Sequence, residues 1–87
     1  MQQTEQKQLE EIIEKFYNTD SAIIKRNIIK YIDASIYKNQ YITDQIGVDI
    51  QTIYLYRQPQ KKTKVTFENA IKLCNVIGIS ITKLMEG

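Results

Sequence analysis

The chain has 87 residues, 43% of them hydrophobic and 25% charged, which indicates one small globular domain. No apolar run approaches the roughly 18 residues of a membrane span, and the polar segment 1–15 is unlike a signal peptide. A single cysteine, Cys74, and the lack of histidine exclude an intramolecular disulfide, a cysteine zinc site and the commonest general base. We therefore expect a cytoplasmic binding protein, with no enzymatic activity and no cofactor.

The formal net charge of +2 conceals an asymmetry along the chain. Residues 1–20 carry five acids and two bases, a charge of −3, whereas residues 21–87 carry ten bases and five acids, a charge of +5. Four bases follow one another without an intervening acid: Arg57, Lys61, Lys62 and Lys64. Such a run favours binding of a polyanion, and the alternative is an ordinary solvated loop.

The first predicted helix runs from Thr4, as its cap, to about Tyr17. Its apolar residues recur at helical spacing and form one face: Leu9, Ile12, Ile13, Phe16 and Tyr17. Three roles are open for this face. It folds back onto the rest of the domain, it pairs with a second copy to make a homodimer, or it docks a different protein.

The second predicted helix opens with Asp20 or Ser21 as its cap and extends to about Ile36. Isoleucines four apart mark its main apolar stripe: Ile24, Ile28, Ile32 and Ile36. The helix is apolar over more than one stripe, so it is expected to pack against both the first helix and the later ones.

A third helix is predicted over 39–46 and a fourth over 50–57. Gly47 suits the left-handed end of the third helix, and Asp49 is a strong cap for the fourth. Lys38 stands where a serine or threonine cap is usual, so we expect Asn39 to cap the third helix instead.

A polar loop over 58–64 follows, because Pro59 ends the preceding helix. Thr66 then caps a fifth helix over 67–77 that Gly78 ends, and Ser80 caps a last short helix through Met85. No strand pattern is present. The prediction is an all-α chain of about six helices, with an extension at 1–20 before a domain at 21–87.

Residues 39–58, NQYITDQIGVDIQTIYLYRQ, have the pattern of a helix-turn-helix. This unit needs a compact residue where its helices cross, here Thr43, and a turn residue, here Gly47. Its remaining requirements are apolar positions that face the core: Ile42, Ile46, Val48, Ile53 and Tyr56.

The segment 66–85 resembles the last two helices of the lambda-repressor-like family of Cro/CI type, with the joint Ile77-Gly78-Ile79-Ser80. With the preceding motif, the resemblance covers about residues 21–85. It implies a five-helix DNA-binding domain of a dimeric transcriptional regulator, and we expect a repressor from a phage, plasmid or other mobile element.

Two positions depart from the family pattern. Arg57 stands where glutamate is common, with Asp33 as a candidate reversed partner. Gln58-Pro59 replaces an Asn-Gly turn, and because proline cannot adopt a positive φ, the loop must take another path.

The resemblance implies that helix 50–57 enters the major groove of an A/T-rich, near-palindromic operator. It assigns base contacts to five residues of that helix: Ile50, Gln51, Thr52, Tyr54 and Leu55. Of these, Gln51 can pair with adenine. Asn39 or Gln40 would bind phosphate at the start of the third helix. Three loop lysines would contact backbone phosphates: Lys61, Lys62 and Lys64.

A second hypothesis uses the same fold as a protein-interaction module, such as an antitoxin or an inhibitor of another protein. Its docking surface would be the apolar face of Ile50, Tyr54 and Leu55. No nucleophile–base pair, phosphate loop or metal cluster is visible in the sequence, so an enzyme is not expected.

Overall fold

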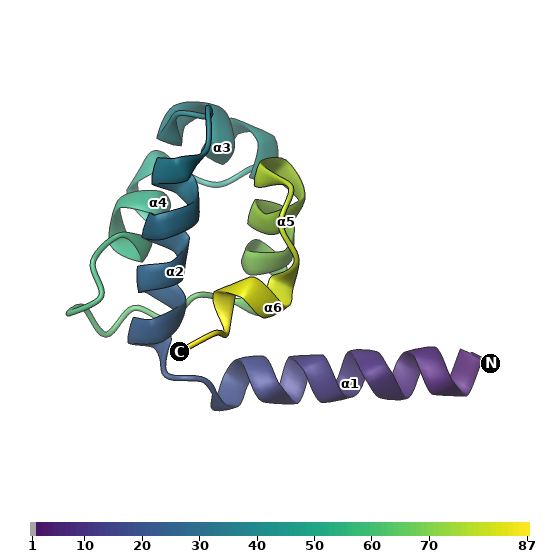
Figure 1. Cartoon of the computed structure of the whole chain (residues 1–87). Helices are drawn as coiled ribbons and strands as arrows, with labels where there is room; N and C mark the ends of the chain where they lie inside the picture. Colours follow the sequence, from purple (N-terminus) through teal and green to yellow (C-terminus); the bar gives the residue numbers. More distant parts are fainter. Residues whose placement is uncertain (1) are drawn as a thin grey trace.

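The computed structural model describes residues 2–87 and the side-chain exposure of residues 6–87. Within that range the chain forms six helices and no strand, which confirms the all-α prediction (Figure 1). The helices are α1 (Gln2–Asn18), α2 (Ser21–Ala34), α3 (Asn39–Ile46), α4 (Ile50–Tyr56), α5 (Phe67–Ile77) and α6 (Ile81–Leu84).

Side-chain caps set the start of four helices where the sequence predicted them. The carboxylate of Asp20 accepts a hydrogen bond from the Ala22 amide at 2.9 Å at the start of α2. Thr66 and Ser80 accept in the same way at α5 and α6, and Asp49 does so at α4. Each cap satisfies one N–H group that the helix itself leaves without a partner.

Three predicted helix ends are wrong. The first helix already includes Gln2, so Thr4 lies inside it and not at its cap. The second ends at Ala34, because Ser35 is extended and its Oγ accepts a hydrogen bond from the Tyr37 amide at 3.2 Å. This turn leaves Ile36 90% exposed instead of on the buried stripe.

The third correction concerns the start of α3. Asn39 is the first residue of the helix itself, and Lys38 occupies the cap position without a side-chain hydrogen bond. Asn39 therefore does not cap α3, because its backbone is already helical.

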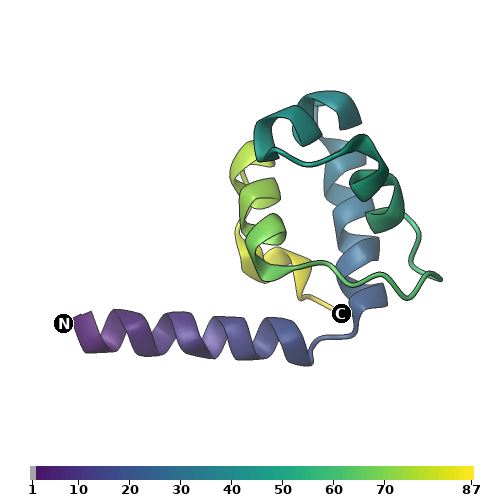
Figure 2. The ribbon, with the colours of Figure 1, turned by 180° about the vertical axis from the view of Figure 1, so that it is seen from behind.

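Helices α2 to α6 form a compact body around one core (Figure 2). Helix α2 packs against α4 and α6, while α3 packs against α4 and α5. The core consists of Phe16, Ile24, Ile28, Ile32, Ile42, Ile53, Tyr56, Val65, Ala70, Leu73, Cys74, Leu84 and Met85. Val48, which was expected in the core, is only half-buried because it lies in the α3–α4 turn.

Helix α1 is half docked and half projecting. Near its end, Phe16 is buried and its ring meets that of Phe67 edge to face at 5.3 Å, while the Tyr17 hydroxyl accepts a 3.4 Å hydrogen bond from the Phe67 amide. Its first half extends past the body, where Leu9 is 50% exposed (Figure 1). Of the three roles left open for this face, the last turns of α1 show the fold-back contact, and Phe16 joins residues 1–20 to the core of the domain.

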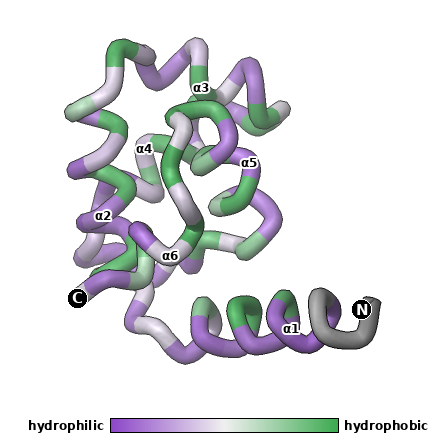
Figure 3. The backbone as a smooth tube through the Cα atoms, turned by 45° about the vertical axis from the view of Figure 1, so that its right-hand side comes forward, coloured by the Kyte–Doolittle hydropathy of each residue, from purple (hydrophilic) through white to green (hydrophobic). Residues whose placement is uncertain are grey.

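In the coloured part of α1, the hydrophobic residues lie on the side turned toward the body (Figure 3). Ile12 lies in a shallow groove with Thr82 and Met85 of the α6 region, so this contact extends the docked part of the helix. One turn nearer the N-terminus, Leu9 lies at helical spacing from Ile12 but is half exposed, so the body does not cover it.

The end of the chain is tied to α2. The Asn27 side-chain amide donates hydrogen bonds to the carbonyl of Leu84 at 2.8 Å and to that of Glu86 at 2.7 Å. These contacts close the body by fixing α6 beneath α2, and the sequence reading did not anticipate them.

Candidate nucleic-acid interface

The turn between α3 and α4 is held by backbone geometry. Gly47 is left-handed, with φ 76°, and its amide and that of Val48 both donate to the Thr43 carbonyl, at 2.9 and 3.1 Å. Because positive φ is strained for residues with a Cβ, glycine is the favourable choice here. The turn joins α3 to α4, and the two helices pack against each other.

Thr43 of α3, the compact residue of the predicted motif, is 1% exposed. Its hydroxyl lies 3.1 Å from the Asn39 carbonyl and 3.0 Å from the Gln40 carbonyl, so the buried polar group is satisfied within its own helix. A compact side chain with an internal hydrogen bond therefore meets the predicted requirement at this position.

Helix α4 has one buried and one exposed side. Ile53 and Tyr56 face the core, and the Tyr56 hydroxyl accepts a 3.0 Å hydrogen bond from the Asn69 side chain of α5. On the other side Gln51 is exposed and Tyr54 is 44% exposed. The core contacts hold α4 so that these two side chains point to solvent.

The other three predicted reading residues are less accessible. Thr52 and Leu55 are half-buried, and Ile50 is half-buried with its side chain packed against the core. Ile50 therefore has a packing role in addition to any contact that it makes outside the protein.

The start of α3 offers backbone donors beside positive charge. Its cap residue, Lys38, supplies no side-chain acceptor, and the first amides of a helix have no partner within the helix. Asn39 and Lys38 line a shallow pocket there together with Arg57 and the carboxylate of Asp33. Gln40 is exposed, and its side-chain amide donates to Asp44 at 2.9 Å, so it is held along α3.

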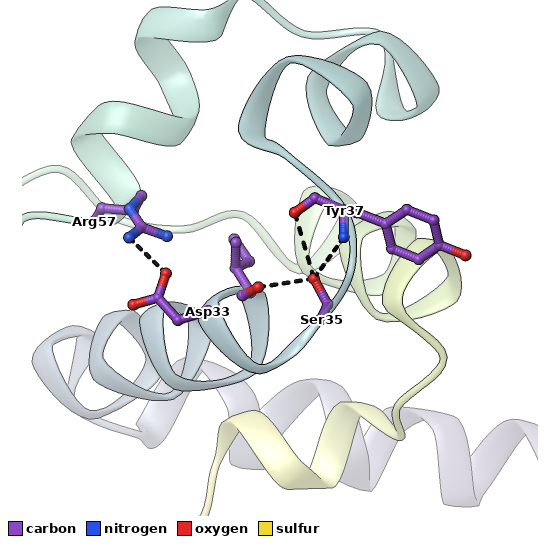
Figure 4. A network of polar contacts seen from close by, with 5 residues as sticks. Asp33, Ser35, Tyr37 and Arg57 are labelled. Carbon is purple, nitrogen blue, oxygen red and sulfur yellow. Dashed lines mark hydrogen bonds and ion pairs between the residues drawn. The ribbon is translucent and has the colours of Figure 1, made fainter.

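The predicted reversed ion pair is present. Arg57 Nη2 lies 2.7 Å from Asp33 Oδ1 and links the end of α4 to α2 (Figure 4). Both side chains are partly exposed, so the pair contributes at most about 1 kcal/mol. Nη1 of Arg57 is buried and has no hydrogen-bond partner within the described part of the chain.

The basic loop over 58–64 opens with a tight turn. The Lys61 amide donates to the Gln58 carbonyl at 3.0 Å, which places Pro59 at the second turn position, where its fixed φ is favourable. No described residue other than glycine has a positive φ. The loop thus avoids the left-handed conformation, as expected from the presence of Gln58-Pro59 in place of an Asn-Gly turn.

The three loop lysines are all exposed. Lys61 closes the turn that follows α4 in the chain, and Lys62 comes directly after it. Lys64 lines a surface cavity at the α1–α2 joint, with Asp20 and Ser21. Of the three lysines, only Lys64 lines that cavity.

Lys25 of α2 was missed by the sequence reading. It is 0% exposed, and its Nζ donates to the carbonyls of Gln58 at 3.3 Å and Lys61 at 3.0 Å. Burial lowers the pKa of this lysine, because a low-polarity environment disfavours the ammonium form. Its spacing to Ile28 and Ile32, three and seven residues away on the buried stripe, was the available signal.

Comparison with family models, with curated proteins and with solved structures finds no match to this chain. Across residues 2–87, no helix has both the length and the apolar character needed to cross a bilayer. The same residues contain no cluster of three or more side chains suited to hold a metal ion.

Proposed function

We propose that this protein is a sequence-specific DNA-binding transcriptional regulator, a repressor of a phage, plasmid or other mobile element. In this proposal α2 to α6 adopt the lambda-repressor-like arrangement, and α4 enters the major groove. The observation that carries the proposal is the orientation of α4. Ile53 and Tyr56 fix it to the core, and Gln51 and Tyr54 lie on its exposed side.

Two neighbouring features favour DNA as the ligand. The uncapped start of α3, with the exposed Lys38 beside it, suits a phosphate because helix N-termini attract anions. Lys61 and Lys62 are exposed in the loop that follows α4, where they suit further phosphates of the DNA backbone. Gln51 reads adenine in this arrangement, and Thr52 and Leu55 contact thymine methyl groups, which favours an A/T-rich operator.

The proposed regulator acts as a homodimer on a near-palindromic operator. Two copies would place their α4 helices about one DNA turn, roughly 34 Å, apart. The projecting half of α1 is the surface available for pairing, because Leu9 is half exposed and lies at helical spacing from the docked residues Ile12 and Phe16.

Fluorescence anisotropy tests the proposal directly. Purified protein is titrated against DNA from upstream of its own gene and against a random duplex, at several salt concentrations. Much tighter binding to the upstream DNA, which weakens as salt rises, is the expected result. Equal weak binding to both duplexes would contradict sequence-specific recognition of that region.

The second candidate function is a protein-interaction module, and exposed tyrosines favour it. Tyr54 on α4 and Tyr41 on α3 are 44% and 46% exposed, and the Tyr41 ring stacks on Tyr37 at 4.9 Å. Aromatic side chains are common at protein interfaces. Recovery of one stoichiometric protein partner without nucleic acid, measured by light scattering after size exclusion, would support this candidate over the first.

A further inference from the structure

The side chain of Lys25 crosses from α2 to the loop that follows α4. Among the described residues it is the one charged side chain that is buried, whereas lysine normally keeps its ammonium group in water. Here the whole residue is inaccessible, and Nζ lies between the carbonyls of Gln58 and Lys61 at 3.3 and 3.0 Å. No carboxylate among the described side chains forms an ion pair with it.

The two acceptors are the ends of one turn. Lys25 binds both carbonyls that the turn directs inward, while the Lys61 amide closes the turn onto the Gln58 carbonyl at 3.0 Å. The turn follows directly after the C-terminal end of α4, where the helix dipole favours a cation. An apolar residue would fill the same space on α2 without the penalty of burying a charge.

The loop has few other anchors. Residues 58–64 form hydrogen bonds with α4 and, through Lys25, with α2. Within the described residues, the two bonds from Lys25 are the only hydrogen bonds that join this loop to a helix other than α4. The Gln58 side chain donates to the Tyr54 carbonyl at 3.1 Å, which fixes only the start of the loop. Val65 is buried at the far end. The position of the segment between them depends on Lys25.

We propose that Lys25 is a positioning residue that clamps the turn after α4 to α2 and so fixes where Lys61 and Lys62 are presented. The inference rests on the proposed function for the role of the two lysines, because they would contact DNA and Lys25 would not. The clamp itself is a property of the free protein.

The first experiment uses no DNA. Native-state hydrogen exchange is measured for the Lys61 amide and for the core amide of Ala70, in the wild type and in Lys25→Met. Loss of the clamp should speed exchange at Lys61 by about tenfold or more beyond the change at Ala70, given the usual strength of a charged hydrogen bond. Equal acceleration at both amides would overturn the clamp, since it would report only a general loss of stability.

The matched control is Lys30→Met. Lys30 lies on the same helix and is exposed, so this variant removes the same charge without touching the loop. It should leave Lys61 exchange unchanged. If Lys25→Met does not fold, nuclear magnetic resonance of the wild type decides the matter. Couplings from the Lys25 ammonium to the carbonyl carbons of Gln58 and Lys61 support the clamp, and a freely exchanging, uncoupled ammonium overturns it.

The second experiment measures duplex binding against salt for the same proteins. Lys25→Met should reduce the steepness of log K against log salt by up to about 2, because each lost phosphate contact lowers it by about 0.9. Lys30→Met should leave the slope unchanged. An unchanged slope in Lys25→Met would overturn the positioning role. Failure of the wild type to bind any duplex would instead refute the proposed function, and the exchange result would still decide whether Lys25 clamps the turn.

Discussion

Single side chains divide the α4 surface into positions that hold the helix and positions that are free to bind. Ile53 is fully buried, and Tyr56 is anchored to Asn69, so changes at either position would unfold the region. The side chain of Gln51 forms no hydrogen bond with the described residues, while its backbone amide donates to the Asp49 cap at 2.9 Å. Its side chain can therefore be altered without disturbing the fold.

Gln51→Ala is expected to weaken operator binding by about 1–3 kcal/mol while leaving binding to random DNA unchanged, because a lost base contact affects only the specific complex. Anisotropy titrations of both duplexes measure the difference. Gln45→Ala, an exposed change on α3, is the matched control. Equal losses on operator and random DNA would count against base recognition by Gln51.

Cys74 provides a second test at this scale. Burial raises the pKa of its thiol from 9.0 to about 11, because the thiolate is poorly solvated in the core. In the unfolded chain the thiol ionises first, so its contribution to stability is complete below pH 9 and declines as pH rises toward 11.

Urea unfolding at several pH values should therefore show the advantage of the wild type over Cys74→Ala shrinking between pH 9 and pH 11. Alkylation offers an independent reading, since native Cys74 should react with iodoacetamide far more slowly than the unfolded protein. A pH-independent difference between the two proteins would contradict a shifted thiol.

At the scale of elements, the turn of the α3–α4 unit depends on one backbone conformation. A Cβ added at Gly47 meets nothing within 4 Å, so a substitution there tests the backbone alone. Gly78 has nearly the same geometry, with φ 77°, at the end of α5.

Gly47→Ala is expected to lower the free energy of unfolding by about 1–2 kcal/mol, and Gly47→Asn by less, because asparagine tolerates the left-handed region better. Chemical denaturation measures both variants, with Gly78→Ala as the comparison. A neutral Gly47→Ala would mean that the turn relaxes to a negative φ.

The basic loop supplies affinity in the proposed complex and no sequence choice. Lys61→Ala and Lys62→Ala should each weaken binding to every duplex and reduce the salt slope by about 1. Lys64→Ala should have a smaller effect, because Lys64 lies at the α1–α2 joint. Salt titrations on random DNA compare the three variants, and a loss confined to the operator would contradict phosphate contact.

Helix ends were predictable where one residue decides them, as at Asp49 and Gly47. The end of α2 was not, because the apolar spacing continues to Ile36 while the Ser35 turn ends the helix. In the candidate site, the exposure of Gln51 followed from helical spacing. Helical spacing also put Lys25 on the buried stripe, but its hydrogen bonds were not predictable, because its acceptors lie 33 and 36 residues away and only tertiary packing brings them together.

At the scale of the whole molecule, the C-terminal half of α1 contributes to the core and its N-terminal half projects from the body. Phe16 is 1% exposed and packs on Phe67, whereas Leu9, on the same helix, is half exposed. The two halves of α1 should therefore respond differently to substitution.

Phe16→Ala should destabilise the protein by about 3–5 kcal/mol, as expected when a buried aromatic ring is removed. Leu9→Lys should change the stability of the monomer by no more than about 0.5 kcal/mol but reduce self-association. Thermal unfolding and sedimentation equilibrium measure the two effects. A Leu9→Lys variant as dimeric as the wild type would exclude Leu9 from the dimer contact.

The bonds from Asn27 to the carbonyls of Leu84 and Glu86 also bear on how the protein is made. The core includes Leu84 and Met85, so it cannot close until these residues have left the ribosome. At about 5–20 residues per second, α2 waits several seconds with its isoleucines uncovered. The last residues of the core therefore set the earliest moment at which the apolar stripe of α2 is covered.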